Sequence, residues 1–298
     1  MKIGYPCINW SLSCRPSRTF RLKSYSESRL VETLGSNLSC LQEILDYNIQ
    51  NHMLFLRLTS DLVPFASHPV CTFPWQKHFS KEFKALGDTI KAAGMRISMH
   101  PDQFTLINSP KMDVFERSRQ ELLYHSEVLD LMGLNLTARI QIHVGGVYGD
   151  KKASLRRFVE REKTLPRSVR RRLAIENDDR LYTLADCLWL HRKTRLPVIF
   201  DTLHHQILSS GEPLEEALSL AFSTWSPQKG RPMLDYSDQE AGGRPGKHAY
   251  SLNLAAFKRF LKRSRPHDFD VMLEIKDKES SAKKALEAAS QQRGVFLD

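Results

Sequence analysis

The 298-residue sequence lacks several features that would place it in common protein classes. No continuous apolar run approaches the ~20 residues needed to cross a bilayer, so a membrane protein is not expected. The first residues contain no continuous apolar core of a secretory signal, and we expect a cytoplasmic protein. The sequence has neither a Walker phosphate loop nor the glycine fingerprint of a dinucleotide-binding fold, so we expect no nucleotide cofactor.

Cysteine is scarce, and its spacing matches no disulfide framework or metal motif. The sequence contains 5 cysteines, with no Cys-x-x-Cys pair: Cys7, Cys14, Cys40, Cys71 and Cys187. An odd set without paired spacing argues against both a disulfide framework and a zinc ribbon. We therefore predict free, reduced thiols.

Acidic residues are outnumbered, with 34 Asp and Glu against 44 Lys and Arg and a net charge of +10. Such an excess favours a polyanionic partner, because each phosphate neutralised by Lys or Arg releases counterions. Nucleic acid is the first candidate. The alternative is that the protein is merely basic, as many cytosolic proteins are.

The chain contains short β-rich runs, each followed by a helical pattern, and this alternation is typical of a parallel sheet. Strands are predicted at residues 2–6, 53–60, 95–100, 138–145, 172–177, 197–201, 232–237 and 270–277. Helices are predicted at residues 28–47, 77–93, 114–132, 181–192, 214–222, 254–262 and 282–289. With no visible linker, this order favours one α/β domain over residues 1–298, a (β/α)8 TIM barrel, whose last ~20 residues form a closing helix and a tail.

The predicted strands end in polar side chains that could bind metal. These candidate ligands are His100, His143, Glu176, Asp201, His204, Asp235 and Glu274, with His248 in the loop after the seventh strand. Each alone could be a rim residue or a helix cap, but together at a barrel mouth they would be electrostatically costly without cations. Nitrogen and oxygen donors without sulfur suit Mn²⁺, Zn²⁺ or Fe²⁺. We predict two or three divalent ions, bridged by a carboxylate such as Glu176, in a nuclease or phosphatase.

Six ordered motifs then carry a resemblance to a known family. They are GYPCIN (4–9), SMHPDQF (98–104), IHVGGVYGDK (142–151), AIENDD (174–179), FDTLHH (200–205) and LEIKDKE (273–279). Together they resemble the UV damage endonucleases, from Met1 to about Glu279. The resemblance implies a TIM barrel similar to endonuclease IV, with a metal cluster, usually manganese, at its mouth. It also implies incision of damaged duplex DNA immediately 5′ of cyclobutane pyrimidine dimers and 6-4 photoproducts.

The resemblance extends to individual residues. Seven of the candidate ligands match metal-ligand positions of the family: His100, His143, Glu176, Asp201, His204, His248 and Glu274. Tyr5, Gln103 and Phe104 match residues that contact or probe the lesion, and Asn9 and His68 match polar positions near the cluster. In the seventh strand, Met233 and Asp235 replace a Lys-x-His pattern. Asp235 would be an oxygen ligand there, whereas Met233 cannot bind a hard ion, and Lys247 could supply the missing lysine.

The residues also suggest a mechanism. A crosslinked dimer stacks poorly and costs less to extrude than normal bases, so Gln103 and Phe104 could enter the vacated duplex, although core packing is the alternative for Phe104. A metal-bound hydroxide would attack phosphorus, with Glu176 and Glu274 as ligands rather than an acid/base pair. Lys276 would neutralise the scissile phosphate, or else form a salt bridge.

The basic residues fall into two groups. Four lie in the long loop after the first strand, where they could hold the DNA backbone: Arg15, Arg18, Arg21 and Lys23. The run at residues 167–172 precedes the fifth strand, on the opposite barrel face, and is expected to be mostly solvated surface. We expect a monomer that associates with the nucleoid when bound to DNA. The alternatives are an abasic-site endonuclease of the endonuclease IV type, a sugar isomerase and a non-catalytic damaged-DNA binder.

Overall fold

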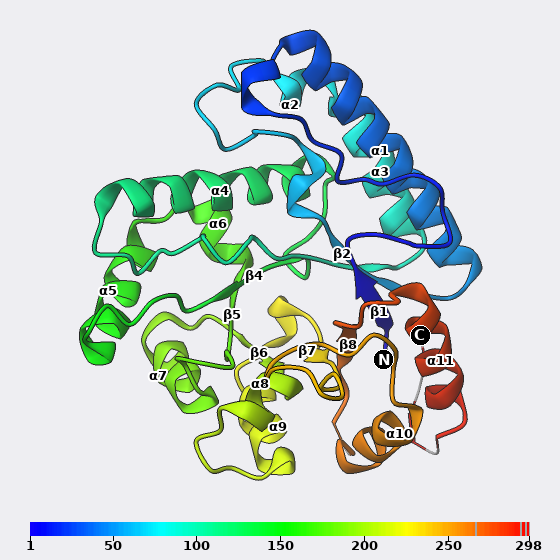
Figure 1. Ribbon diagram of the computed structural model, residues 1–298, viewed down its shortest axis with the longest axis vertical. Helices are drawn as coiled ribbons and strands as arrows, with labels where there is room; N and C mark the ends of the chain where they lie inside the picture. The colour runs from blue at the N-terminus through cyan, green and yellow to red at the C-terminus, as the bar shows by residue number, and fades with distance from the viewer. Residues whose placement is uncertain (266, 293, 296, 298) are drawn as a thin grey trace.

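Eight parallel strands form a closed barrel in sequence order, with helices around its outside (Figure 1). The computed structural model describes residues 1–265, 267–292, 294, 295 and 297. The strands are β1 (Ile3–Pro6), β2 (Phe55–Leu58), β3 (Arg96–Met99), β4 (Arg139–His143), β5 (Leu173–Glu176), β6 (Val198–Asp201), β7 (Met233–Tyr236) and β8 (Asp270–Leu273). The last strand closes the barrel because Ile3 pairs with Val271 and Gly4 with Met272. The predicted TIM barrel is confirmed.

Each predicted strand contains one observed strand, but the observed strands are shorter. The predicted ranges ran on into the loops, so His100 and Glu274 lie just beyond the ends of β3 and β8. Strand residues are almost all buried, which is expected of a parallel sheet whose outer face is covered by helices. The barrel therefore presents the ends of its strands, rather than a sheet face, to solvent.

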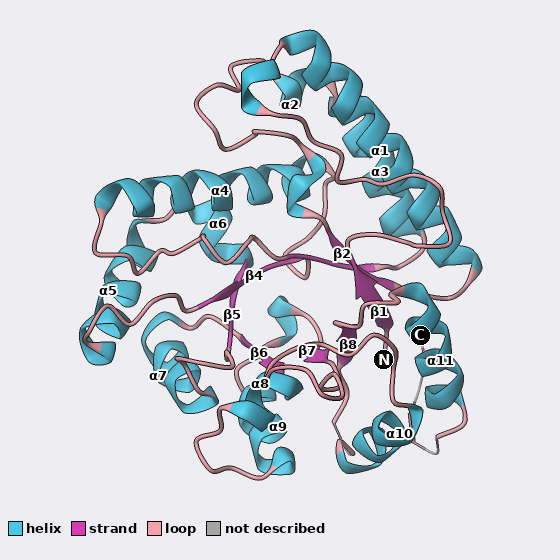
Figure 2. Cartoon of the chain, viewed as in Figure 1, coloured by secondary structure: helices cyan, strands magenta, loops and turns pink. Residues whose placement is uncertain are grey.

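The helices alternate with the strands around the barrel (Figure 2). They are α1 (Glu27–Gln50), α2 (Trp75–His78), α3 (Ser80–Ala92), α4 (Met112–Leu131), α5 (Lys151–Thr164), α6 (Arg167–Arg172), α7 (Leu184–Thr194), α8 (Thr202–Ile207), α9 (Leu214–Phe222), α10 (Leu254–Arg263) and α11 (Glu279–Ser290). The closing helix is α11; of the expected tail, residues 293, 296 and 298 lie outside the described residues. No helix in the described part of the chain is long and apolar enough to cross a membrane.

The basic run at residues 167–172 is not simply solvated surface. It forms helix α6, and Arg172 is buried, with its guanidinium 2.6 Å from Asp130 and hydrogen-bonded to the carbonyl of Leu134 at 2.7 Å. Most of the arginines of the run are exposed, as expected, but Arg172 is buried, which is possible because a long guanidinium can satisfy several buried carbonyls at once. As expected, the helix directly precedes β5 and so lies at the end of the barrel opposite the strand tips.

An apolar layer fills the barrel interior. Its buried members are Phe55, Ala174, Ile199, Met233 and Met272, each from a different strand. Because side chains two residues apart point to the same face of a strand, the residue two positions further along each strand also faces the interior, nearer the mouth. Met233, which replaces the lysine expected from the resemblance, thus belongs to the packed layer beneath the mouth.

Candidate metal and DNA site

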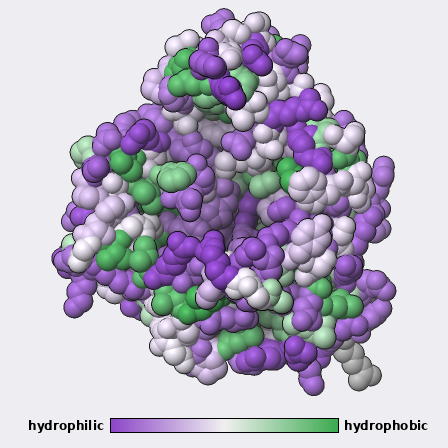
Figure 3. All heavy atoms as spheres, viewed as in Figure 1, coloured by the Kyte–Doolittle hydropathy of each residue, from purple (hydrophilic) through white to green (hydrophobic). Residues whose placement is uncertain are grey.

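A polar layer lies directly above the apolar one. Its members follow the five apolar residues at a spacing of two: Arg57, Glu176, Asp201, Asp235 and Glu274. These side chains are drawn from β2, β5, β6 and β7 and from the residue just after β8. The alternation of each strand therefore builds a charged floor at the barrel mouth. Figure 3 shows a hollow lined by hydrophilic residues at the centre of this face.

Two groups of potential metal ligands share one carboxylate. One group is His100, His143 and Glu176, and the other is Glu176, Asp201 and His204, with the ligand atoms of each group within 4.8 Å of one another. Glu176 offers one oxygen to each side, because Oε2 lies 3.1 Å from His100 Nε2 and Oε1 lies 3.1 Å from His204 Nδ1. This arrangement suits a carboxylate that bridges two ions.

Two buried atoms at this site also fit a metal. Asp201 Oδ2 and His143 Nδ1 are buried and have no hydrogen-bond partner among the described residues. Buried polar atoms are rarely left unsatisfied, and an ion is one of the groups that can satisfy them. The donor set of imidazole nitrogens and carboxylate oxygens suits a divalent transition ion. The residues therefore fit a divalent metal.

Burial and charge shift the carboxylates of this site in opposite directions. Burial is the largest influence on Asp201 and Asp235 and raises the pKa of each to about 7. Burial acts in the same direction on Glu176, but His143 and His100 outweigh it and hold the pKa of Glu176 well below its ordinary value. The buried carboxylates thus outnumber the positive groups near them, and bound divalent ions would stabilise their charged forms.

Two further predicted ligands meet on the other side of the mouth. Glu274 is held by its backbone N–H, which donates to the carbonyl of Tyr236 at 2.9 Å. His248 arrives from the loop after β7, donates from Nδ1 to the Glu274 carbonyl at 2.8 Å, and has Nε2 3.7 Å from Glu274 Oε2. Burial would raise the pKa of Glu274, but Arg57 outweighs it and lowers this pKa to about 2.

The eighth predicted ligand, Asp235, has both oxygens engaged. Oδ1 accepts from Arg57 Nη2 at 2.7 Å, and Oδ2 accepts from Gln141 Nε2. The same Gln141 amide donates to Glu176 Oε2 at 2.6 Å. Arg57 and Gln141 were not predicted as site residues, because neither lies at a strand tip or in the loop after it. Both face the interior from within predicted strands, and a charged or amide residue at such a position was the available signal.

The loop after β3 carries the predicted lesion-probing pair. Phe104 is 72% exposed, so the alternative of core packing is wrong. Its backbone N–H donates to Asp102 Oδ1 at 2.8 Å, which fixes a tight turn. Gln103 lines a cavity of about 510 Å³ together with His143, His204 and His248, whereas Phe104 lines a neighbouring cavity of about 680 Å³ with His68. Gln103 therefore borders the cavity of the candidate ligands, and Phe104 borders the neighbouring one.

Comparison with known proteins agrees with this geometry. The family model of the UV-endonuclease UvdE matches residues 1–294. The chain belongs to the UvdE family. It is 38% identical over 288 residues to a UV DNA damage endonuclease of Clostridium perfringens (strain 13 / Type A), covering 96% of this chain and 70% of that protein.

Solved structures extend the comparison to three dimensions. The crystal structure of SacUVDE is 45% identical, covers 98% of both chains and superposes with a TM-score of 0.94. Endonuclease IV from Thermus thermophilus is 16% identical, covers 96% of this chain and 97% of its own, and gives a TM-score of 0.60. The second likeness shows a shared TIM-barrel fold and no more.

In this UvdE member, Tyr5 lies beneath the surface and supports the loop after β1. Its side chain is completely buried, and its hydroxyl donates to Asn48 Oδ1 at 2.6 Å and accepts from Asn9 Nδ2 at 2.8 Å. Contact between Tyr5 and a lesion, as the resemblance implies, stays a prediction and would require this side chain to become exposed. Asn9 is buried as well, and both residues fix the start of the loop after β1. His68 is exposed and lines the cavity beside Phe104.

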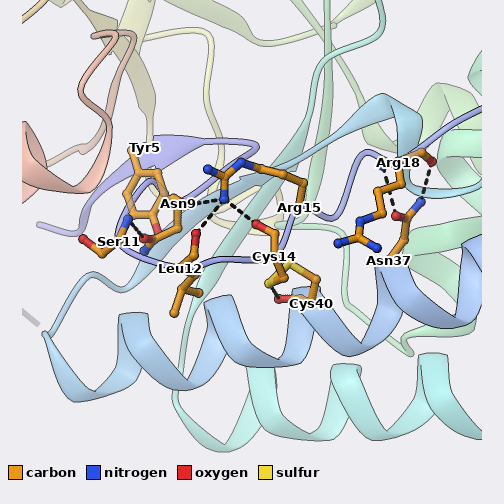
Figure 4. Close-up of a disulfide and its surroundings, with 9 residues drawn as sticks. All are labelled: Tyr5, Asn9, Ser11, Leu12, Cys14, Arg15, Arg18, Asn37 and Cys40. Atoms are coloured by element: carbon orange, nitrogen blue, oxygen red, sulfur yellow. Dashed lines mark hydrogen bonds between the residues drawn. A yellow bond between two sulfur atoms is a disulfide. The ribbon is translucent and has the colours of Figure 1, made fainter.

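One arginine of the basic loop after β1 hydrogen-bonds to the backbone of the loop itself. Arg15 donates to the carbonyls of Leu12 at 2.7 Å and Cys14 at 2.5 Å, as Figure 4 shows. Its guanidinium is thereby tied to its own loop. Arg18, Arg21 and Lys23 are exposed further along the same loop. Because these three side chains are exposed, they are better placed than Arg15 to contact a phosphate backbone.

The expectation of five reduced thiols is wrong for one pair. Cys14 and Cys40 form a disulfide bond that joins the loop after β1 to helix α1 (Figure 4), while Cys7, Cys71 and Cys187 are free. An odd number of cysteines does not exclude a single bond, and the 26-residue separation gives no sequence signal of contact. The disulfide and the Tyr5 network anchor the same loop.

Two lysines flank the Glu274 side of the mouth. Lys276 donates to Glu240 Oε1 at 2.7 Å, and Glu240 also pairs with Lys247. Lys276 thus forms the salt bridge that was the alternative to its role at the scissile phosphate. Lys278 was overlooked, although it lines the same cavity of about 390 Å³ as Lys276 and Glu274. Its φ of 50° is unusual for a residue other than glycine, and burial lowers its pKa. Strained backbone of this kind is often found at functional sites.

Proposed function

We propose that this UvdE member nicks duplex DNA immediately 5′ of ultraviolet photoproducts, both cyclobutane pyrimidine dimers and 6-4 photoproducts, with the help of divalent metal. One observation carries the proposal: Glu176 is shared by two ligand groups at the barrel mouth, next to a loop that exposes Phe104. The first feature supplies phosphodiester chemistry, and the second a means to test the stacking of a duplex.

The metal would be held by seven side chains: His100, His143, Glu176, Asp201, His204, His248 and Glu274. Bound divalent ions supply Lewis-acid chemistry for phosphodiester hydrolysis. Nitrogen and oxygen donors in this ratio suit Mn²⁺, with Zn²⁺ or Fe²⁺ as other occupants. Glu176 and Glu274 act as metal ligands in this proposal, and neither is required to transfer a proton.

Besides binding metal, the protein must bind a deformed duplex. The exposed aromatic side chains of the described residues all lie in loops that follow strands, at the same end of the barrel as the ligands: Trp10, Phe104, Tyr148 and Tyr250. Each can stack on a base without selecting its sequence. A photoproduct pairs and stacks poorly, so extruding it costs less than extruding normal bases, and this difference would provide the selectivity.

Phosphate contacts would come from cations at the same face. Arg18, Arg21 and Lys23 project from the loop after β1, and Lys276 and Lys278 line the cavity beside Glu274. Such contacts position a duplex without reading its sequence and weaken as salt increases. All of these groups and all seven ligands belong to one chain. We also propose that the protein is a monomer that acts on damaged double-stranded DNA at the nucleoid in the cytoplasm.

The deciding experiment is incision of an end-labelled duplex that carries one defined cyclobutane dimer, in the presence of Mn²⁺. Undamaged and abasic duplexes and an EDTA control accompany it. We expect a metal-dependent nick on the 5′ side of the dimer and none in undamaged DNA. Incision of the abasic duplex alone would instead indicate an activity of the endonuclease IV type, and tight binding of the dimer without a nick would indicate a non-catalytic damage binder.

A further inference from the structure

Two buried aspartates occupy equivalent places on neighbouring strands but differ in their partners. Asp201 and Asp235 are paired in register on β6 and β7, and both are completely buried. Asp201 Oδ1 accepts the backbone N–H of His204 at 2.7 Å, while Oδ2 lies 3.6 Å from His204 Nδ1 and has no hydrogen-bond partner among the described residues. One carboxylate thus has an oxygen available to an ion, whereas both oxygens of Asp235 are occupied.

The group that occupies Asp235 is a buried cation. Arg57 points from β2 into the barrel, is 4% exposed, and reaches the carboxylates of both Asp235 and Glu274. Its Nη2 also donates to Gln141 Oε1 at 3.0 Å. A guanidinium carries its charge at any pH the protein meets and presents several donors in one plane, so it can hold two carboxylates at once.

We propose that Arg57 supplies the positive charge on the Glu274 side of the mouth in place of a third divalent ion, so that this chain holds two ions, both bound by Glu176, and the seven ligands of the proposed function serve these two ions. Asp235 is then the partner of Arg57 and not a metal ligand. This inference rests on the metal site of the proposed function. A further ion bound by Asp235 would lie next to the guanidinium, and two cations at such a distance in a buried site repel strongly.

Arg57 is consequently a positioning residue. It holds the Glu274 carboxylate directly, and it is linked to Glu176 through Gln141, whose amide nitrogen donates to Glu176 and to Asp235. The two sides of the mouth are therefore joined by one hydrogen-bonded chain of protein groups. Groups that support metal ligands in this way typically change metal affinity by about 10- to 100-fold when removed.

The first test is the number of bound ions. Protein saturated with Mn²⁺ and freed of excess metal by gel filtration is analysed by elemental mass spectrometry, and the ions are located by anomalous diffraction at the manganese edge. We expect two ions per chain, with the Arg57 contact to Glu274 retained. Three ions, or an ion within bonding distance of Asp235, would overturn the proposal.

The second test uses the matched aspartates. Asp201→Asn should lose one of the two ions, because it weakens a ligand. Asp235→Asn should retain both, because Asn still offers an acceptor to Arg57. Loss of an ion from Asp235→Asn would make Asp235 a ligand and contradict the assignment. The counts do not depend on incision, so a protein that holds two ions but leaves the dimer intact would count only against the proposed function.

The third test removes the arginine. Arg57→Gln leaves the carboxylates of Asp235 and Glu274 without their cation, and with Mn²⁺ in excess we expect the count to rise to three. A folded variant that still holds two ions or fewer would show that Arg57 does not replace one. Should the variant fail to fold, the paired aspartate variants and the wild-type count still decide the question.

Discussion

Cys14 and Cys40 are joined by a disulfide bond across 26 residues, which fixes the loop after β1 to the middle of helix α1. Closing a loop of this length restricts the unfolded chain and should stabilise the folded protein by about 3 kcal/mol. We expect the oxidised protein to unfold at a higher urea concentration than the reduced protein, measured by circular dichroism.

The double variant Cys14→Ser/Cys40→Ser should unfold at the same urea concentration with and without reductant. Cys71→Ser, which removes a free thiol, is the matched control and should retain the difference. Thiol titration in denaturant should find three reactive thiols in the oxidised wild type. Five reactive thiols, or identical unfolding of oxidised and reduced protein, would show that the bond does not form in solution.

Glu176 is the residue whose charge both ligand groups need. Glu176→Gln preserves the shape of the side chain but removes the negative charge, so we expect it to abolish tight Mn²⁺ binding. Incision should fall by more than the roughly 10- to 100-fold typical of losing a group that only supports a ligand. Protein stripped with EDTA should regain Mn²⁺ binding in the wild type and not in the variant. The control is Glu160→Gln on the exposed side of α5, and equal metal content in the two variants would contradict the bridging role.

Substituting Phe104 tests whether its ring stacks in the duplex, and the substitution should leave the fold intact. Because the ring is 72% exposed, Phe104→Ala should change the free energy of unfolding by less than about 0.5 kcal/mol. Stacking on a base is worth about 1–3 kcal/mol, so binding of a dimer-containing duplex should weaken by roughly 5- to 150-fold. Phe104→Tyr should restore binding and Phe104→Leu should not, measured by fluorescence anisotropy. Wild-type affinity in the alanine variant would exclude a stacking role.

The barrel and the two groups of candidate metal ligands were predictable because both depend on local pattern. Strands that end in His100, Glu176 or Asp201 must bring those residues to one mouth once the sheet is parallel and closed. Helix α5 was not predicted because its apolar stripe is thin: Leu155 and Phe158 are among its few buried apolar residues. Charged residues dominate the rest of that helix, so the helical period of its apolar residues is hard to recognise in the sequence.

What could not be predicted depends on contacts between distant residues. The partner of Asp235 is Arg57, 178 residues away, and nothing near either residue indicates the other. The burial of Tyr5 follows from Asn48 in a helix that packs over it, and the Cys14–Cys40 bond from the path of a long loop. Closure of the barrel places Arg57 and Asp235 face to face from different strands, and the packing of α1 against the barrel brings Asn48 to Tyr5 and Cys40 to Cys14. Such contacts exist only in the complete fold.

His125, on helix α4, makes the stability depend on pH. It is completely buried, and its Nδ1 donates to the carbonyl of Glu121 at 2.7 Å. Burial lowers the pKa of His125 to about 4, although the Glu121 carbonyl acts in the opposite direction. An unfolded chain has a histidine pKa near 6.5, so between about pH 6.5 and 4 the unfolded state binds a proton that the folded state does not. Stability therefore falls as the pH decreases through this range.

His125→Asn separates this contribution from that of other titrating groups, because its amide can donate to the same carbonyl and does not titrate. Between pH 7 and pH 4.5 the wild type should lose about 2–3 kcal/mol more stability than the variant, measured by urea unfolding at each pH. The variant is expected to be less stable at pH 7, and the gap should narrow as the pH falls. Parallel stability curves would mean that the folded protein takes up the proton at His125 as readily as the unfolded chain does.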